Sequence, residues 1–427
     1  MTSRNSSNGN IRRSRAAAAF AGVVASVTLA TAACGSGGQT SPAAAPAAPK
    51  AQQPAIPQTQ RTLTIKDLYE QGRHSVFQIV GRVPGGSVTG TGFVVDRGRG
   101  MALTNAHVVS DMTAIKAYFP DGGQYSLHVM AQDPCSDLAI VHFADALDAN
   151  VTQVSLGTAA GLQVGDAVTT LGFPGAAATS AESSPRPTIA TGMIQANKAV
   201  VTGGDDLPQY VNTIQHNATI NPGNSGGPLY DAHGKVVGVN SLSTSSSQAQ
   251  GLFYSISIDR VKDKLAALEG GNSENDAGWT LKPLSSFTFS DLLPELAMGS
   301  SAQGAWVDRA VRTGALKGLV VTGTTPGGSA DQGGLQPLDV VQTVQDQPVH
   351  SVAEACDVIE SVMPGSQVRV SYLRFPGLTR RVSEFTFQGT HQGSGAAPEG
   401  GTGHGMEHGP AGKPSPGPDA PMPPGHM

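Results

Sequence analysis

The sequence predicts a mainly β protein, with a pair of β-barrels followed by a smaller α+β domain and with disordered termini. Short β-type runs separated by Gly, Pro and Asp fill residues 62–268, which is typical of all-β barrels and not of alternating strands and helices. The runs form two successive halves, which fits two barrels with a cleft between them. Gly and Pro gather at both ends of the chain, and such stretches bury too little apolar surface to fold.

The β-type runs of the first half are Val76–Val83, Gly90–Asp96, Ala102–Asn105, Ile115–Phe119, Ser126–Ala131 and Ala139–Phe143. Those of the second half are Ala167–Gly172, Thr188–Asn197, Tyr210–Ile214, Val236–Leu242 and Phe253–Ile258. A short helix is expected before them, over Thr64–Glu70. A second helix is expected to close the region over Asp259–Leu268, because Val261, Leu265 and Leu268 lie on one side of it.

Composition limits the classes of function. The 427 residues are enough for two domains with tails. Only 14% of the residues are charged and the formal net charge is −5, so the chain lacks the basic excess of a nucleic-acid-binding protein and we expect no such partner. Three cysteines do not make a fully paired framework. Because Cys135 and Cys356 fall in different predicted domains, we expect no disulfide between them and interpret both as small buried apolar side chains.

Residues 1–33 are predicted to be a signal peptide, because arginines precede the uncharged stretch Ala16–Ala33. Thr31–Gly35 resembles a bacterial lipobox, which implies a lipid on Cys34, although Thr31 stands where that pattern prefers leucine. The alternatives are an uncleaved signal anchor and simple secretion. Each places the chain in the cell envelope or beyond it, outside the cytoplasm, with a membrane tether in the first two. Residues 34–61 are expected to be a disordered spacer.

Ser225 lies in the segment Asn221–Leu229, among closely spaced glycines. Glycines let the backbone approach a substrate and aim N–H groups at one point, as an oxyanion hole requires. Two further segments supply His107 and Asp137. Each residue alone has an ordinary interpretation: a strand-end histidine, a turn aspartate and a polar loop serine. Together, in the order histidine, aspartate, serine, they favour a catalytic triad.

These three segments resemble those of chymotrypsin-fold serine proteases, specifically the HtrA/Deg branch. The resemblance implies a trypsin-like protease domain, a chymotrypsin-like double barrel, over residues 62–268. Ser225 would be its nucleophile and His107 its general base, with Asp137 orienting the imidazole. The N–H groups of Gly223 and Ser225 are the expected oxyanion donors. No cofactor and no metal ion are expected.

The resemblance also suggests where a substrate would bind. It places Thr219 near the base of the primary specificity pocket, and the neighbouring residues carry no acidic group. A preference for Lys or Arg is therefore disfavoured, and small to medium apolar side chains are expected. Asn240, Ser241 and Leu242 would pair with the substrate backbone, unless they form an interior structural strand.

Asn224 precedes the serine where digestive relatives carry an aspartate that pairs with a newly cut N-terminus. Because Asn224 is neutral, we expect activation by rearrangement of loops and not by cleavage of a propeptide. The alternative is that asparagine is merely tolerated there as an isostere.

Residues 269–278 are predicted to be a linker and residues 279–389 a smaller domain. Gly318–Val321, Pro326–Ala330 and Gly333–Val341 resemble a PDZ domain of the permuted bacterial type, although Leu338 replaces a glycine of that pattern. The resemblance implies binding of peptide C-termini or internal segments. A helix over Val352–Val362 and a strand over Gln367–Arg374 are expected.

Residues 390–427 are predicted to be a disordered tail rich in Gly, Pro and His. Its scattered histidines lack the preset geometry of a zinc site, so we predict no metal there.

The sequence therefore predicts an exported, membrane-tethered HtrA-like serine endopeptidase with one PDZ-type module. The resemblance implies unfolded, misfolded or damaged proteins as substrates. The resemblance also suggests a homo-oligomer, because members of the family often form trimers. Two alternatives stay open: a non-catalytic peptide-binding scaffold or holdase, and a processing protease with one native substrate.

Overall fold

The computed structural model of the protein describes residues 61–83, 86–110, 112–175, 185–202, 204–246, 249–287, 301–375 and 377–388. All of them belong to one compact unit, Thr59–Met427. The predicted signal peptide, Cys34, the spacer up to residue 60 and the tail from residue 390 lie outside the described residues. Among the helices of the described ranges, none combines the length and the apolar character needed to span a bilayer.

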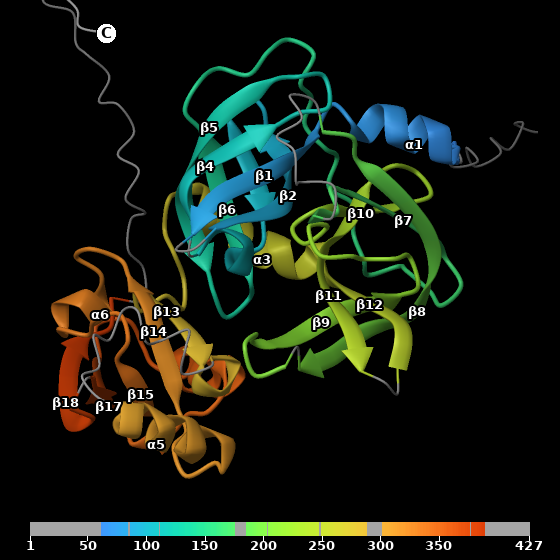
Figure 1. Cartoon of the computed structure of the whole chain (residues 1–427). Coiled ribbons are helices and arrows are strands. Elements are labelled where there is room, and N and C mark those ends of the chain that lie inside the picture. The colour runs from blue at the N-terminus through green and yellow to red at the C-terminus, as the bar shows by residue number, and fades with distance from the viewer. Residues whose placement is uncertain are drawn as a thin grey trace, which may run out of the picture. The chain divides into compact units, whose positions relative to one another are not determined.

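The first barrel closes through antiparallel pairing in the order β1-β2-β3-β6-β5-β4 (Figure 1). Its strands are β1 (Val76–Val83), β2 (Gly86–Asp96), β3 (Met101–Thr104), β4 (Thr113–Tyr118), β5 (Gln124–Asp133) and β6 (Leu138–Phe143). At the start of β5, Tyr125 and Leu127 are buried while the residues between and beside them are exposed, the alternation of a strand with one face on a core. Phe77, Phe119 and Phe143 fill the barrel, with ring centroids 5.1 to 6.1 Å apart.

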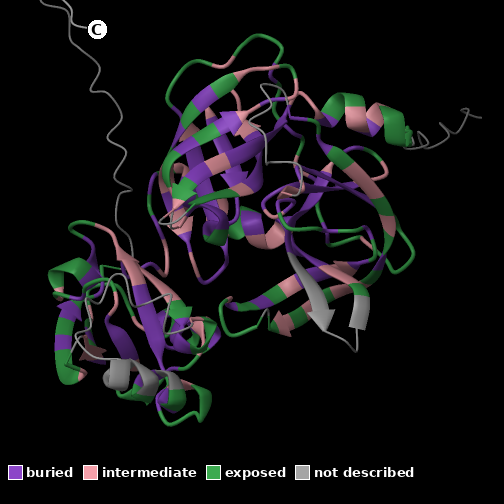
Figure 2. Ribbon diagram, viewed as in Figure 1, coloured by how far each residue is buried: buried purple, intermediate pink, exposed green. Residues whose placement is uncertain are grey.

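The second barrel closes in the order β10-β11-β12-β9-β8-β7. Its strands are β7 (Ala167–Gly172), β8 (Thr188–Thr202), β9 (Gln209–His216), β10 (Pro228–Asp231), β11 (Val236–Ser246) and β12 (Ala249–Ser257). Buried residues run along the inner faces of both barrels (Figure 2). The predicted mainly β fold class with two barrels is therefore confirmed. Strand β10 was missed because it begins inside the glycine-rich serine segment and is only four residues long.

Helices flank the barrels. Helix α1 (Ile65–Gly72) begins at a capping box formed by Thr64 and Asp67, and α2 (Ala106–Val109) is a single turn after β3. Helix α3 (Ile258–Glu269) follows β12 directly. Its Val261 and Leu268 pack into an apolar cluster that draws side chains from both barrels, so α3 helps to hold the two barrels together.

Residues 277–388 are here called the C-terminal domain. Their described part forms an antiparallel sheet with helices. The strands are β13 (Trp279–Pro283), β14 (Leu319–Thr324), β15 (Val340–Val344), β16 (Gln347–Pro348), β17 (Gln367–Arg374) and β18 (Thr379–Thr386), in the order β13-β14-β15-β17-β18 with β16 paired to β15. The helices are η2 (Leu284–Ser286), α5 (Ser301–Arg312), α6 (Ser329–Gln332) and α7 (Val352–Glu360). Leu338 has φ +75°, so the position where the motif has glycine does adopt the left-handed conformation.

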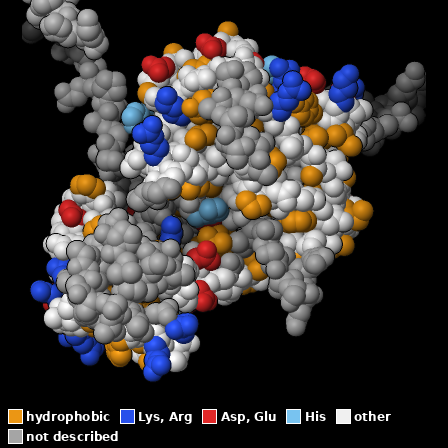
Figure 3. Space-filling view, viewed as in Figure 1, with side chains coloured by type: hydrophobic (Ala, Val, Ile, Leu, Met, Phe, Trp, Pro, Cys, Tyr) orange, Lys and Arg blue, Asp and Glu red, His pale blue; other side chains and the backbone are white. Residues whose placement is uncertain are grey.

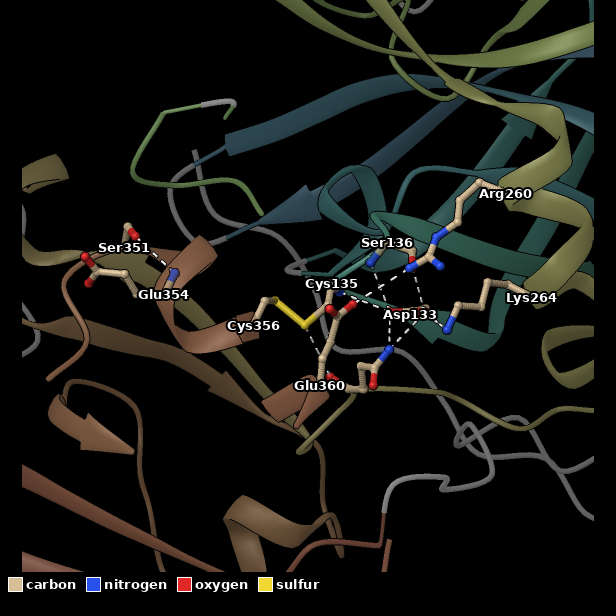
Figure 4. Close-up of a disulfide and its surroundings, with 10 residues drawn as sticks. Asp133, Cys135, Ser136, Arg260, Lys264, Ser351, Glu354, Cys356 and Glu360 are labelled. Atoms are coloured by element: carbon tan, nitrogen blue, oxygen red, sulfur yellow. Dashed lines mark hydrogen bonds and ion pairs between the residues drawn. A yellow bond between two sulfur atoms is a disulfide. The ribbon is translucent and has the colours of Figure 1, made fainter. Parts of the chain in front are cut away.

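The structure contradicts the expectation for two cysteines. Cys135 and Cys356 form a disulfide, with their Cα atoms 5.4 Å apart. It joins the turn between β5 and β6 to helix α7 of the C-terminal domain (Figure 4). The prediction was wrong because membership of different domains was taken to mean distance. Chain separation does not set spatial separation, and the geometric limit on a disulfide is the distance between the two Cα atoms.

This bridge is directly testable by peptide mapping. Digestion of the full chain without a reductant is expected to release the Cys135 and Cys356 peptides as one linked species, which dithiothreitol separates. Mass spectrometry identifies the species. Alkylation of both thiols by iodoacetamide in denatured, unreduced protein would contradict the structure.

Candidate active site

The turn between β5 and β6 positions Asp137. At its start the fully buried carboxylate of Asp133 accepts the N–H groups of Cys135 (3.1 Å) and Ser136 (3.0 Å) and lies 3.1 Å from the ammonium of Lys264. A buried charge needs such partners. Asp137 then adopts φ +54°, a left-handed conformation that aspartate tolerates better than most residues.

His107 lies on the single-turn helix α2, just after β3 ends. The main-chain N–H of His107 donates to Asp137 Oδ1 (3.0 Å). The ring Nδ1 of His107 lies 2.9 Å from both oxygens of the same carboxylate. An ionised carboxylate only accepts, so Nδ1 carries the proton and Nε2 is the acceptor of the neutral ring. Asn105 donates to the main-chain oxygen of Asp137 (2.9 Å). Histidine and aspartate are therefore held as an oriented pair.

The second barrel contributes two further donors to Asp137. The Tyr210 hydroxyl donates to Oδ2 (2.8 Å) and so does the Ser241 hydroxyl (2.9 Å), which lies 3.0 Å from the tyrosine oxygen. Tyr210 was missed as a site residue because the sequence shows it only as one apolar position of a strand. Nothing in the residues around Tyr210 distinguishes it from an ordinary core residue of a strand.

Charge and burial set the pKa values of this cluster. Burial alone would lower the pKa of His107, but the charge of Asp137, its hydrogen bond and the charge of Asp206 together raise it above the usual value. Burial, followed by the charge of Asp137, raises the pKa of Tyr210 well above its usual value. Tyr210 is therefore a neutral hydrogen-bond donor at ordinary pH.

Ser225 lies on the loop between β9 and β10, where two glycines are required. Gly223 has φ +100° and Gly226 φ +84°, and a side chain at Gly226 would lie 2.2 Å from Thr91 O. Thr91, on β2 of the first barrel, donates its N–H to Ser225 O (2.9 Å) and its hydroxyl to Gly223 O (2.6 Å). The serine loop of the second barrel is thus bound by the first.

The Ser225 hydroxyl donates to the main-chain oxygen of Ser241 (3.3 Å). Because the Ser241 hydroxyl binds Asp137, one residue links Ser225 to the His107–Asp137 pair. Within the described residues no hydrogen bond joins Ser225 Oγ to His107. Hydrogen bonds of this kind are often absent without substrate and form in the complex.

The backbone around Ser225 leaves two donors unused. The N–H groups of Gly223 and Ser225 donate to no residue in the described part of the chain, whereas those of Asn224 and Gly226 donate to Asn221 O (2.9 Å) and Asn240 O (2.8 Å). The side chain of Asn224 is buried, and its Oδ1 accepts no hydrogen bond from the described residues. Among the described residues, no cationic side chain forms a hydrogen bond with the Asn224 side chain.

The remaining predicted binding residues occupy different environments. Thr219 is exposed. Asn240 is fully buried, and its side chain donates to Pro228 O (3.2 Å) and accepts from Ser255 (2.9 Å). Leu242 pairs with Tyr254 in the β11–β12 ladder. The side chain of Asn240 thus fits the interior alternative, while the main chain of Ser241 lies beside Ser225.

Figure 3 shows acidic and basic side chains distributed over the visible face, with apolar side chains in small groups. Within the described ranges no three His, Cys, Asp or Glu side chains are grouped so as to hold a metal ion.

Residues 90–239 match the family model of the trypsin-like peptidase domain. The chain carries such a domain. It is 26% identical over 287 residues to the periplasmic serine endoprotease DegP of Salmonella typhimurium, covering 67% of this chain and 54% of the relative. It is 30% identical over 295 residues to a probable periplasmic DegP-like serine endoprotease of Chlamydia muridarum, covering 67% and 52%. The chain thus spans about half the length of these relatives.

Two solved structures are similar to the chain. One is the HtrA-type protease AlgW with a tripeptide (25% identity, TM-score 0.44, 80% of this chain and 100% of that chain). The other is a serine endoprotease from Yersinia pestis (22% identity, TM-score 0.41, 76% and 97%).

The pKa of His107 is a testable property of this cluster. We expect the pKa of the His107 imidazole to lie above that of an unperturbed histidine. The Asp206→Asn variant should lower this pKa, because a negative charge that favours the imidazolium is lost. Histidine-selective NMR on the full chain, assigned with His107→Ala, measures both values. Asp145→Asn, an exposed aspartate, is the control. A wild-type pKa of His107 no higher than that of an unperturbed histidine would contradict the prediction.

Proposed function

We propose that this chain is an exported HtrA-like serine endopeptidase that cleaves unfolded or damaged proteins through an acyl-enzyme. Ser225 is the nucleophile, His107 the general base and then the general acid, and Asp137 the residue that orients the imidazole. The observation that carries the proposal is the bonding of Asp137. Its carboxylate binds His107 from one barrel and Ser241 from the other, and Ser241 in turn binds Ser225.

The reaction begins with a reorientation of the nucleophile. The Ser225 hydroxyl turns from Ser241 O toward His107 Nε2, gives up its proton there and attacks the scissile carbonyl carbon. Asp137 stabilises the imidazolium, which then protonates the leaving amine. Because the neutral imidazole is the base, the rate rises as pH increases through the raised pKa of His107.

The N–H groups of Gly223 and Ser225 donate hydrogen bonds to the oxyanion of the tetrahedral intermediate. The left-handed conformation of Gly223 keeps this backbone in place, and neither N–H is used by the described residues. Loss of one such donor costs about 3–4 kcal/mol of transition-state stabilisation in serine proteases. This catalysis by fixed backbone donors needs no cofactor.

Export is supported by covalent chemistry as well as by the N-terminal sequence. Disulfides persist in oxidising compartments outside the cytoplasm, and the chain contains the Cys135–Cys356 bridge. The DegP relatives are named as periplasmic enzymes. Residues 1–33 would direct export, and Cys34 would carry the lipid that tethers the chain to the membrane.

The C-terminal domain is assigned as a PDZ-like module that binds peptide C-termini or internal segments. Its edge strand β13 and its helix α7 line one cavity, the arrangement through which an extended peptide adds to a sheet. Thr219, Ser241 and Leu242 are assigned to substrate binding near Ser225, with a preference for apolar side chains. A homo-oligomer is proposed from the family resemblance alone.

Hydrolysis of casein, an unfolded protein, tests the proposal. The Ser225→Ala variant is expected to lose about 10⁵- to 10⁶-fold in kcat, as in other serine proteases that lose the nucleophile. Ser126→Ala, an exposed serine of β5, is the matched control and should retain full activity. Equal hydrolysis by the two variants would overturn the assignment.

The scaffold alternative is favoured by one observation: in the described part of the chain, no hydrogen bond joins Ser225 to His107. Labelling with a fluorophosphonate separates the two functions, because only an activated serine reacts. Modification of Ser225 in the wild type supports the enzyme. Absence of labelling in both resting and peptide-treated protein supports the scaffold, and cleavage of a single native protein but not of casein supports a processing protease.

Tyr210→Phe tests whether Asp137 is positioned from the second barrel. A hydrogen bond to a charged group contributes about 1.5–3 kcal/mol, so kcat should fall about tenfold or more while KM stays nearly constant. Tyr254→Phe, a buried tyrosine of β12, is the matched control. Steady-state kinetics measure the effect. A change confined to KM would show that Tyr210 does not act on the chemical step.

A further inference from the structure

Thr91 lies on β2 of the first barrel, yet its main chain and its side chain both bind the segments that form the site. Its N–H donates to Ser225 O (2.9 Å), and its main-chain oxygen accepts the hydroxyl of Thr104, the last residue of β3 (2.7 Å). Its hydroxyl donates to Gly223 O (2.6 Å) and accepts the N–H of Phe173 (3.0 Å). Thr91 is fully buried. One buried residue therefore joins β3, the end of β7 and the serine loop.

The peptide planes on either side of Gly223 show what the Thr91 hydroxyl controls. Thr91 binds the oxygen of the plane after Gly223, and the N–H of Gly175 donates to the oxygen of the plane before it, Pro222 O (2.7 Å). Peptide bonds are almost always trans, so N–H and C=O point in opposite directions. The bond to Pro222 O therefore turns the N–H of Gly223 to the opposite side. A side chain at Gly223 would lie 2.4 Å from Phe173 O, so this backbone packs directly on the segment that Thr91 also binds.

The N–H of Ser225, the second expected oxyanion donor, also lies between two fixed planes. Asn224 O, in the same plane as this N–H, accepts the N–H of Gly227 (3.0 Å), and Ser225 O, in the next plane, accepts the N–H of Thr91. Of the four bonds that fix these planes, the one made by the Thr91 hydroxyl comes from a side chain. It is therefore the one that a substitution can remove.

We propose that Thr91 is a positioning residue for the oxyanion hole, whose hydroxyl, supplied by the first barrel, fixes the direction of the Gly223 N–H in the second. The inference rests on the proposed function and adds a residue that touches neither substrate nor reacting atoms. Oxyanion donors stabilise the transition state only when they are already aimed at the position of its oxygen. Loss of the Thr91 hydroxyl should therefore slow the chemical step and leave substrate binding nearly unchanged.

The histidine–aspartate pair does not depend on this hydroxyl. Asn105 binds the main-chain oxygen of Asp137, and Tyr210 and Ser241 bind its carboxylate. None of these bonds involves Thr91, and the main-chain bonds of Thr91 are retained in every substitution. The rate should therefore fall without a change in the pKa of the general base. This combination separates a misaligned oxyanion hole from a general loss of the site.

Thr91→Ala and Thr91→Ser, made in the full chain, test the proposal because the two variants differ by one hydroxyl and neither adds bulk. Thr91→Ala is expected to lower kcat for casein about 10- to 100-fold. KM should stay within about threefold, and the midpoint of the pH–rate profile should not move. Thr91→Ser should restore kcat to within about threefold of the wild type. The matched control is Thr213→Ala, which removes a buried hydroxyl of β9 that donates to Ala199 O (2.9 Å), and it should keep the wild-type kcat.

Equal kcat values for Thr91→Ala and Thr91→Ser overturn the proposal, and so does a loss that is confined to KM or that Thr213→Ala reproduces. A crystal structure of the wild type labelled at Ser225 by a fluorophosphonate covers the case in which Thr91→Ala fails to fold. The phosphoryl oxygen should accept the N–H groups of Gly223 and Ser225 while Thr91 Oγ1 stays bound to Gly223 O. A broken bond between Thr91 and Gly223 in that adduct overturns the proposal.

The outcome for the wild type separates this inference from the proposed function. A wild type that neither hydrolyses casein nor reacts with the fluorophosphonate overturns the proposed function and, with it, the role of Thr91. An active wild type beside an equally active Thr91→Ala overturns the role of Thr91 alone.

Discussion

The buried carboxylate of Asp133 fixes the turn on which the site depends. It accepts two main-chain N–H groups and the Ser136 hydroxyl, and it pairs with Lys264 of α3. A buried charge with this many partners is costly to disturb, because removal of any partner leaves it uncompensated. The turn therefore has one conformation, in which Asp137 points to His107 and Cys135 points to the C-terminal domain.

The two barrels complete one another's part of the site. Asp137 belongs to the first barrel, but two of its donors, Tyr210 and Ser241, come from the second. Ser225 belongs to the second barrel, but its loop is bound by Thr91 of the first. Because each element relies on hydrogen bonds from the opposite barrel, the arrangement exists only when both barrels are folded and packed. Local unfolding of one barrel would thus remove the geometry of both halves.

The sequence predicted the features that depend on local residue patterns. It did not predict the contacts that depend on packing between distant segments. Alternation and turn residues identified most barrel strands, and Gly223 and Gly226 marked a loop whose backbone does need glycine. Tyr210 and Thr91 carry no such pattern, since their roles arise from partners far along the chain. The disulfide was predicted wrongly for the same reason: the spacing of Cys135 and Cys356 says nothing about a contact created by domain packing. The motifs thus identified the candidate residues of the site, but they did not identify the hydrogen bonds that position those residues.

The same turn also connects the C-terminal domain to Asp137. Cys135 and Asp137 are separated by Ser136 alone, so a displacement of the disulfide acts next to Asp137. Ser136, however, is held at both its N–H and its hydroxyl by Asp133, and its hydroxyl also accepts from Arg260 (3.1 Å). Rigid, fully bonded networks resist small displacements. A displacement of α7 is therefore resisted at Ser136 before it reaches the carboxylate that is bonded to His107.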